Sequence, residues 1–157
     1  QLLNQELAHD SIEAALSAGT SIFDVVDAVK RIRAIEAFKK QPACASLVIA
    51  FKRVSNILKG YDLTNTTPVI ALFKDENEKT LYDAALKVSP LIHEHWKLGR
   101  YEDALITLAS IKDTIDAFFD KVLVMAEGET TRTNRLALLN FVRNLYIQTA
   151  DLSKIVI

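Results

Sequence analysis

The stretch PACASLVIAFKRVSNILKG, residues 42–60, decides the fold class of this chain. At about 100° per residue, its large apolar side chains fall within an arc of about 120° on one face of a helix. We therefore expect a helix over residues 42–59 that starts at a proline and ends before Gly60, with Phe51 in a hydrophobic core. The opposite face is basic and rich in hydrogen-bonding groups; it carries Lys52, Asn56 and Lys59, with Arg53 on its flank.

Similar patterns surround this helix on both sides. Apolar spacing predicts further helices over residues 11–18, 22–40, 75–98, 101–119 and 131–148. Pro90 is expected to kink or divide the helix over residues 75–98. The chain has four Gly and three Pro, too few turn-forming residues for a fold of many short strands. The sequence therefore predicts an all-α helical bundle.

The expected helix boundaries rest on glycines and capping residues. Each glycine follows an apolar-periodic segment, the position at which a helix can end in a left-handed residue: Gly19, Gly60, Gly99 and Gly128. Ser21, with Asp24 three residues later, is typical of a helix start. These signals predict where the helices begin and end.

The composition is that of an ordinary globular protein, with 157 residues of which 50% are hydrophobic and 25% charged. The single cysteine, Cys44, cannot form an internal disulfide, and no apolar run approaches the roughly 20 residues of a membrane span. We therefore expect a cytoplasmic protein. Because the chain starts with Gln1 rather than Met, we expect a fragment: residues 1–20 as the tail of a preceding region and residues 21–157 as a helical domain.

Charge is segregated along the chain although the net charge is only −1. Residues 28–60 contain eight basic residues and one acidic residue, residues 101–129 contain two basic and seven acidic residues, and residues 130–157 contain four basic and one acidic residue. A neutral protein with this pattern can present one strongly positive surface, which suits a polyanionic partner. The alternative is that these charges are scattered over a solvated surface.

Residues that would carry catalysis or bind a metal are scarce. No two glycines lie close enough to form a phosphate-binding loop. His93 and His95 are two residues apart, so on a helix they point in nearly opposite directions and cannot share a metal ion. We therefore expect no catalytic residue, no metal and no cofactor in this chain.

Two segments in the last third of the chain are more specific than a generic amphipathic helix. Residues 118–127 read FFDKVLVMAE and residues 132–139 read RTNRLALL, and residues 150–154 read ADLSK. Together they resemble the C-terminal anticodon-binding domain of the bacterial glycyl-tRNA synthetase β subunit. Residues 51–58, FKRVSNIL, and the segment 72–82 extend the resemblance upstream, so that it covers about residues 10–154.

The resemblance implies an all-helical domain of the type that arginyl-tRNA synthetase and its class I relatives use to bind anticodons. It implies a parent enzyme of α2β2 composition that ligates glycine to tRNA, with the ATP and glycine sites outside this chain. The implied partners are tRNA(Gly), the α subunit and the remainder of the β subunit, with no membrane and no metal.

An anticodon lies in a single-stranded loop whose bases can be splayed out and read along their Watson–Crick edges. Cationic side chains hold its phosphates, while Arg and Asn can bond to base edges. The second and third bases of a glycine anticodon are cytosines, which offer an amino donor and acceptors at N3 and O2. We expect backbone contacts from Lys30, Arg31 and Arg33, and a reading and clamping set made of Lys52, Arg53, Asn56, Arg132, Asn134 and Arg135.

Alternatives stay open for several of these residues. Arg132 and Arg135 could instead pair with acidic residues of the segment 113–129, and Asn56 could be a buried amide that bridges two helices. For the whole chain, the alternative is a helical module that docks on a protein partner without binding RNA; salt should weaken RNA binding but not apolar docking. If RNA binds, one continuous positive surface is expected from Lys30, Arg31, Arg33, Lys52 and Arg53.

Overall fold

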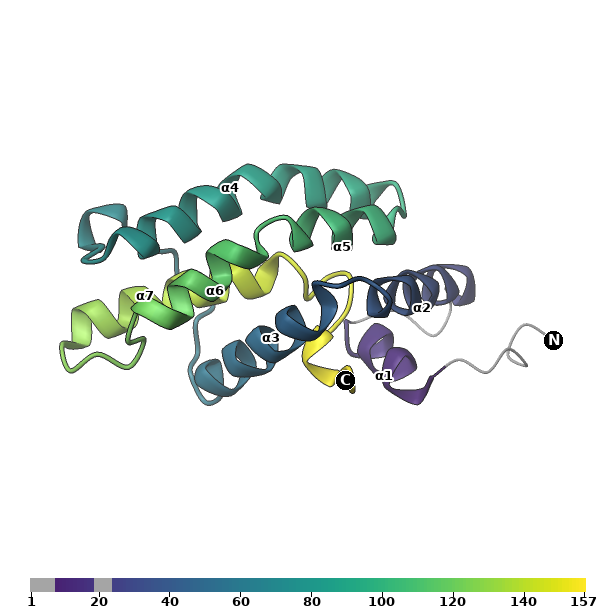
Figure 1. Ribbon diagram of the computed structural model, residues 1–157, viewed down its shortest axis with the longest axis horizontal. Coiled ribbons are helices and arrows are strands. Elements are labelled where there is room, and N and C mark those ends of the chain that lie inside the picture. The colour runs from purple at the N-terminus through teal and green to yellow at the C-terminus, as the bar shows by residue number, and fades with distance from the viewer. Residues whose placement is uncertain (1–7, 19–23) are drawn as a thin grey trace.

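The computed structural model describes residues 8–18 and 24–157, and within these ranges it contains seven α-helices and no β-strand (Figure 1). The helices are α1 (His9–Ser17), α2 (Val25–Lys39), α3 (Cys44–Leu58), α4 (Glu76–Lys97), α5 (Tyr101–Ala109), α6 (Lys112–Lys121) and α7 (Glu129–Asn144). Two short 3-10 turns complete the fold, η2 (Ile70–Leu72) and η3 (Leu152–Lys154). The predicted all-α bundle is confirmed.

The helices pack as an elongated bundle. In Figure 1, α4 runs along the top with α5 and α6 beneath it, and α3 lies below them beside α7. At the other end of the molecule, α1 packs against α2, and α2 packs against α5. The chain then returns after α7, so that η3 packs against both α3 and α1. No helix in the described ranges is long and apolar enough to cross a membrane.

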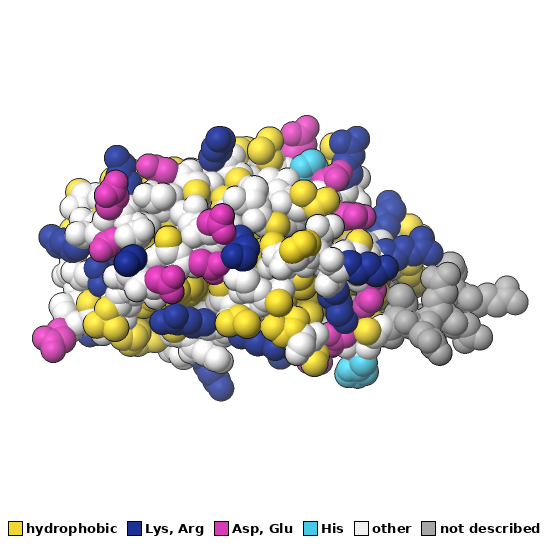
Figure 2. All heavy atoms as spheres, viewed as in Figure 1, with side chains coloured by type: hydrophobic (Ala, Val, Ile, Leu, Met, Phe, Trp, Pro, Cys, Tyr) yellow, Lys and Arg dark blue, Asp and Glu magenta, His cyan; other side chains and the backbone are white. Residues whose placement is uncertain are grey.

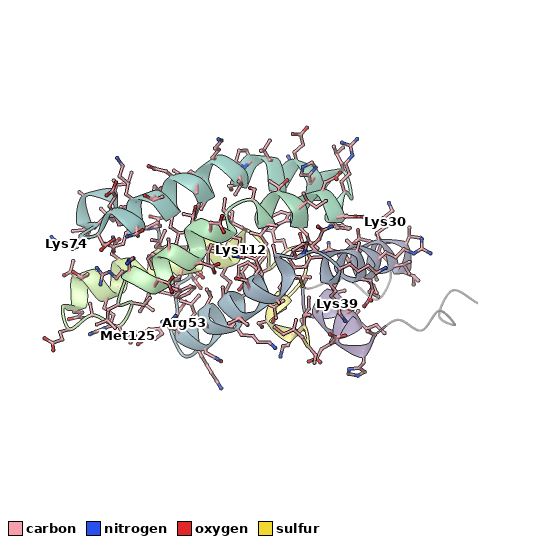
Figure 3. The ribbon with its side chains drawn as sticks, in the orientation of Figure 1. Lys30, Lys39, Arg53, Lys74, Lys112 and Met125 are labelled. Atoms are coloured by element: carbon pink, nitrogen blue, oxygen red, sulfur yellow. The ribbon has the colours of Figure 1, made fainter. Side chains whose placement is uncertain are left out.

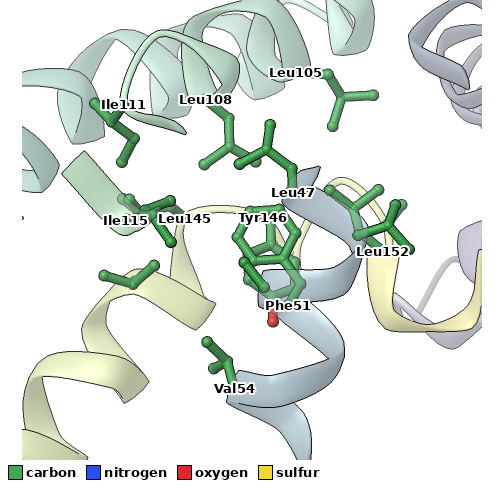
Figure 4. Packing of buried hydrophobic residues seen from close by; sticks show 14 of the residues in the cluster. Leu47, Phe51, Val54, Leu105, Leu108, Ile111, Ile115, Leu145, Tyr146 and Leu152 are labelled. Carbon is green, nitrogen blue, oxygen red and sulfur yellow. The ribbon is translucent and has the colours of Figure 1, made fainter. Parts of the chain in front are cut away.

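The core forms around the apolar face that was predicted for α3. Phe51 is fully buried, and its ring stacks on that of Tyr146 with a centroid distance of 4.1 Å (Figure 4). Leu47 and Val54, on the same face of α3, are fully buried as well. Ala14 and Ala15 of α1 belong to the same hydrophobic cluster. The core position of Phe51 is thus confirmed.

The structure corrects two of the expected helices. The segment 101–119 forms two helices, α5 and α6, because the chain turns at Ser110, whose hydroxyl donates to the carbonyl of Thr107 at 2.6 Å and competes with the helical bonding pattern. Pro90 does not divide α4. Pro90 and Leu86 are both exposed, so water can satisfy the Leu86 carbonyl, which lacks a helical N–H partner.

The helix boundaries follow some of the predicted signals. Gly60 and Gly99 have positive φ angles of 86° and 66° and end α3 and α4 as expected. Gly128 instead has φ −67° and precedes α7, so its predicted role as a helix end is wrong. The helix start expected at Ser21 and the helix end expected at Gly19 lie outside the described residues; Asp24 caps α2 by accepting from the N–H of Asp27 at 2.9 Å.

Candidate nucleic-acid interface

A cleft of about 1040 Å³ lies between α3 and α7. It is lined by the second half of α3, the loop 59–67, the end of α7 and the segment 151–154. Most of the lining side chains are charged or can form hydrogen bonds: the cations Lys52, Lys59, Arg143 and Lys154, the carboxylates Asp62 and Asp151, and the amides Asn56, Asn65, Asn140 and Asn144. Such a surface suits a charged, hydrogen-bonding ligand.

Helical spacing brings these side chains together. On α3, Lys52, Asn56 and Lys59 are separated by four and three residues, so they share the face opposite the buried one. On α7, Asn140, Arg143 and Asn144 share a face for the same reason. Because α3 and α7 pack against each other, the two polar faces line the same cleft.

The loop that closes one end of the cleft is attached to α7. The side-chain amide of Asn140 donates to the carbonyl of Leu63 at 3.3 Å. Asn65 adopts a left-handed conformation with φ 60°, which asparagine tolerates better than most residues. Tyr61, in the same loop, lines the cleft and is 44% exposed. The loop therefore places an accessible aromatic ring beside the cations.

The cations of the cleft outnumber its carboxylates, four to two. Within the described residues, Lys52, Lys59 and Arg143 form no ion pair. Lys154 lies 3.8 Å from the carboxylate of Glu13. Asp62 accepts from the N–H of Thr64 at 3.1 Å, and the hydrogen bonds from Thr64 hold the pKa of Asp62 below its ordinary value. The cleft thus attracts anions, while its acids are held within local turns.

The elements that form this cleft are those of a known family. The family model of the DALR anticodon binding domain matches residues 47–155, which include α3, α7 and the segment 151–154. The chain belongs to this family.

Relatives of this DALR domain are parts of much longer proteins. The chain is 43% identical over 155 residues to the glycine–tRNA ligase β subunit of Geobacter metallireducens, covering 98% of this chain and 22% of that protein. It is 43% identical over 148 residues to that of Desulforudis audaxviator, covering 94% and 21%, and 39% identical over 155 residues to that of Aromatoleum aromaticum, covering 98% and 22%. The chain thus spans about a fifth of the length of these relatives. The resemblance seen in the sequence is confirmed.

Two of the residues predicted to contact RNA lie in the cleft of the DALR domain. Lys52 is half-buried and Asn56 is exposed, and both line the cleft. The alternative of a buried Asn56 bridging two helices is therefore wrong. Within the described part of the chain, the side chain of Asn56 forms no hydrogen bond, so its amide is free to bond to a ligand.

The other predicted basic residues of α2 and α3 lie outside the cleft. Arg53 is exposed and stacks over Phe119, with its guanidinium carbon 4.5 Å from the ring centroid. Lys30 and Arg33 are exposed on α2, and Lys30 lies beside Gly99 at the turn between α4 and α5. Figure 3 shows Lys30 and Arg53 at well-separated parts of the molecule. The expected single continuous positive surface is therefore not present, because α2 and α3 carry their cations to different sites.

Arg31 holds the fold together instead of facing solvent. Its guanidinium pairs with Asp27 at 2.7 Å, lies 4.4 Å from the ring centroid of Tyr101 and donates to the carbonyls of Gln148 and Thr149. The indole N–H of Trp96 donates to the hydroxyl of Thr149. Arg31 thus anchors the chain just before the segment 151–154, and its contact with the RNA backbone stays a prediction.

Asn134 and Arg135 also have interior positions. The amide of Asn134 accepts from the N–H of Val69 at 2.7 Å and donates to the carbonyl of Val69 at 3.1 Å. Arg135 pairs with the fully buried Glu78 at 2.9 Å and donates to the carbonyl of Leu123 at 2.7 Å. Both groups are buried and bonded to the protein, which favours a structural role. That both side chains read bases stays a prediction.

Arg132 is half-buried at the start of α7. Its guanidinium donates to the carbonyls of Ala126 and Glu127 at 3.1 and 3.4 Å. The alternative of an ion pair with acidic residues of the segment 113–129 is wrong for both arginines: Arg132 bonds to backbone, and the partner of Arg135 is Glu78. Neither arginine lines the cleft.

The structure adds residues that the sequence reasoning did not select. Lys59, Tyr61, Arg143 and Lys154 line the cleft together with Lys52 and Asn56. Lys59 follows Asn56 by three residues and therefore lies on the same polar face of α3, which the sequence alone could have shown. Arg143 and Lys154 belong to the basic segment 130–157, but only the packing of α7 and η3 against α3 brings them to Lys52. No cluster of three or more potential metal ligands occurs in the described ranges.

Proposed function

We propose that this chain binds the anticodon loop of tRNA(Gly) in the cleft between α3 and α7. The observation that supports this proposal most is the chemistry of the cleft walls. Among residues 8–18 and 24–157, Lys52 and Lys59 on one side of the cleft and Arg143 on the other have no acidic partner, and the side-chain amides of Asn56 and Asn144 in the same cleft form no hydrogen bond. Membership of the DALR anticodon binding domain family points to the same ligand.

The walls offer each kind of contact that a single-stranded RNA loop needs. Lys52 and Lys59 supply positive charge for phosphates. Asn56 and Asn144 each offer a donor and an acceptor for base edges, and Tyr61 offers an exposed ring on which a base can stack. Recognition of this kind combines affinity from the phosphates with selectivity from the bases.

The ligation reaction would belong to the parts of the parent enzyme outside this chain. The names of the similar β subunits support a parent enzyme that joins glycine to tRNA. We therefore propose the α subunit and the remainder of the β subunit as partners, with the ATP and glycine sites located there. In this arrangement, the present chain positions the tRNA through its anticodon loop.

The proposal is tested by titrating a fluorescently labelled glycine anticodon stem-loop with the chain between about 50 and 200 mM salt. We expect the affinity to fall steeply as salt rises. Lys59→Ala should weaken binding and reduce the salt dependence, whereas Lys87→Ala should change neither. Lys87 is exposed on α4, outside the cleft, so this control removes the same charge elsewhere. Absence of salt-dependent binding would contradict the proposed function.

Docking on a protein partner is the second candidate function. Leu123 is 70% exposed and Met125 is 47% exposed. Figure 2 shows hydrophobic side chains gathered at the end of the molecule where Figure 3 labels Met125. Apolar docking there would persist as salt rises, so the salt dependence of binding distinguishes it from RNA recognition.

A further inference from the structure

Arg143 and Asp151 carry opposite charges and line the same cleft, yet within the described residues they form no ion pair. Between them in the sequence lies Tyr146, a fully buried residue stacked on Phe51 (Figure 4). Burial raises the pKa of Tyr146, and the charges of Asp151 and Arg143 shift it in opposite directions. Both side chains line the cleft between α3 and α7.

Asp151 is a fixed hydrogen-bond acceptor. Its Oδ1 accepts from the N–H and the hydroxyl of Ser153 at 3.2 and 2.6 Å. Its own N–H donates to the carbonyl of Ala14 at 2.9 Å, and the preceding Thr149 is bonded to Arg31 and Trp96. Oδ2 forms no hydrogen bond within the described chain, so the carboxylate keeps one oxygen free to accept from a ligand.

In the part of the chain that the structure describes, Arg143 is a donor without a partner. Its side chain is half-buried on α7, and its guanidinium forms no hydrogen bond or ion pair among the described residues. A guanidinium has several N–H groups in a planar fork and no acceptor, so it can donate to two neighbouring acceptors at once. The cleft thus offers one fixed acceptor and a pair of donors.

A carboxylate in an RNA-binding cleft can interact favourably with only a few groups of the RNA. It repels phosphates, and as an acceptor it can bond only to donors such as the amino group of a base. Cytosine presents an amino donor at N4 beside acceptors at N3 and O2. An acceptor next to two donors is the complementary pattern, which is also the pattern that guanine offers to cytosine in a base pair.

We propose that Arg143 and Asp151 together read one unpaired cytosine of the bound loop. Asp151 accepts from the N4 amino group, and Arg143 donates to N3 and O2. Uracil has an acceptor, O4, in place of the amino group and a donor, N3–H, in place of the acceptor at N3. It would therefore lose the bond to Asp151 and the Arg143 bond at N3, and keep only the Arg143 bond at O2. The inference rests on the proposed function, because it names the base that the anticodon-binding cleft selects.

The test compares the glycine anticodon stem-loop with two variants in which one of the two anticodon cytosines is replaced by uracil. For the wild-type chain, one of these replacements should weaken binding about 10- to 100-fold, the range of a lost specific base contact. Asp151→Asn keeps an oxygen for Ser153 and offers an amide that can donate to O4. This variant should reduce the preference for cytosine at that position severalfold without abolishing it, because the N3–H of uracil still faces Arg143.

Asp62→Asn provides the matched control, because Asp62 lies in the same cleft, also accepts from a nearby N–H and carries the same charge. It should strengthen binding of all three RNAs by a similar factor and leave the preference for cytosine intact. If Asp151→Asn behaves like Asp62→Asn, or if the wild-type chain binds all three RNAs equally, the inference is wrong while the proposed function stands. If no RNA binds in a salt-dependent manner, both are wrong. Thermal melting followed by circular dichroism confirms that each variant is folded.

Discussion

The Nε of Arg135 lies 2.9 Å from Oε1 of Glu78, and the carboxylate of this ion pair is fully buried. Glu78 also accepts from the backbone N–H groups of Lys74 and Asp75, both at 2.7 Å, and Arg135 donates to the carbonyl of Leu123. The pair therefore connects the start of α4, the start of α7 and the loop between α6 and α7. Its position explains why an arginine within a family motif serves the fold.

Removing Arg135 should destabilise the protein strongly. Arg135→Met leaves the Glu78 carboxylate buried without its cationic partner, which typically costs about 3–5 kcal/mol of unfolding free energy. Urea unfolding at pH 7 measures this loss. Arg33→Met, on the exposed part of α2, should change the unfolding free energy by less than about 0.5 kcal/mol. A loss below about 1 kcal/mol for Arg135→Met would contradict the structural role.

The same pair predicts a pH dependence of stability. Burial alone would raise the pKa of Glu78, but the bonds from Arg135 and from two backbone N–H groups hold it below the ordinary value of 4.5. Because the folded-state pKa is lower than the unfolded one, the stabilisation is present above about pH 4.5 and is lost as the pH falls through the folded-state pKa.

We therefore expect the stability difference between the wild-type chain and Glu78→Gln to be largest near pH 7 and to shrink on acidification below about pH 4.5. Urea unfolding at a series of pH values measures this difference, and the other carboxylates of the chain cancel in the comparison. A difference that stays constant between neutral and acid pH would show that Glu78 does not stabilise the fold through its charge.

Asn134 should behave as a structural residue as well. Asn134→Ala removes both bonds to the backbone of Val69 and leaves these two backbone groups unpaired, which should cost about 1–3 kcal/mol of unfolding free energy. Asn144→Ala, on the exposed end of α7, should have little effect on stability. In RNA titrations of the folded variant, Asn134→Ala should affect cognate and base-changed loops alike. Selective loss on the cognate loop would instead make Asn134 a base reader.

Local periodicity predicted the helical class and the buried face of α3, because both depend on residues a few positions apart. The partners of charged and amide side chains depend on tertiary packing. Asn134 and Val69 are 65 positions apart, and Arg135 and Glu78 are 57 positions apart. An arginine or asparagine in a family motif has the same sequence pattern whether it holds a loop or binds RNA, so the sequence could not separate the two roles.

The cleft was only half predictable for the same reason. Lys52 and Asn56 follow from the polar face of α3, which the sequence shows directly. Arg143 and Asp151 come from the other end of the chain and join them only through the packing of α7 and η3 on α3. The basic residues around Arg31 predict an exposed side chain in a positive surface. Its hydrogen-bond acceptors, the carbonyls of Gln148 and Thr149, are more than a hundred residues away in the sequence, so local patterns cannot reveal them.

Phe51 should contribute strongly to stability. Its side chain is fully buried and stacks on Tyr146, so Phe51→Ala would leave a cavity that costs about 3–5 kcal/mol of unfolding free energy. Ile49→Ala on the same helix is the control, because Ile49 is 61% exposed and its truncation should cost far less. Equal losses for the two variants would mean that α3 turns a different face to the core.

Lys52 and Arg53 are neighbours in sequence that lie on different surfaces of the structure. Lys52 lines the cleft, whereas Arg53 lies over the ring of Phe119 outside it. If the cleft holds RNA phosphates, Lys52→Ala should weaken cognate and base-changed loops about equally, because a phosphate contact carries no base information. It should also lower the slope of log Kd against log salt concentration by about 0.7, the value of one contact to a single strand.

Arg53→Ala removes the same charge one residue away and should leave that slope unchanged. The opposite result, with Arg53 altering the slope and Lys52 not, would move the RNA-binding surface from the α3–α7 cleft to the α3–α6 side of the bundle.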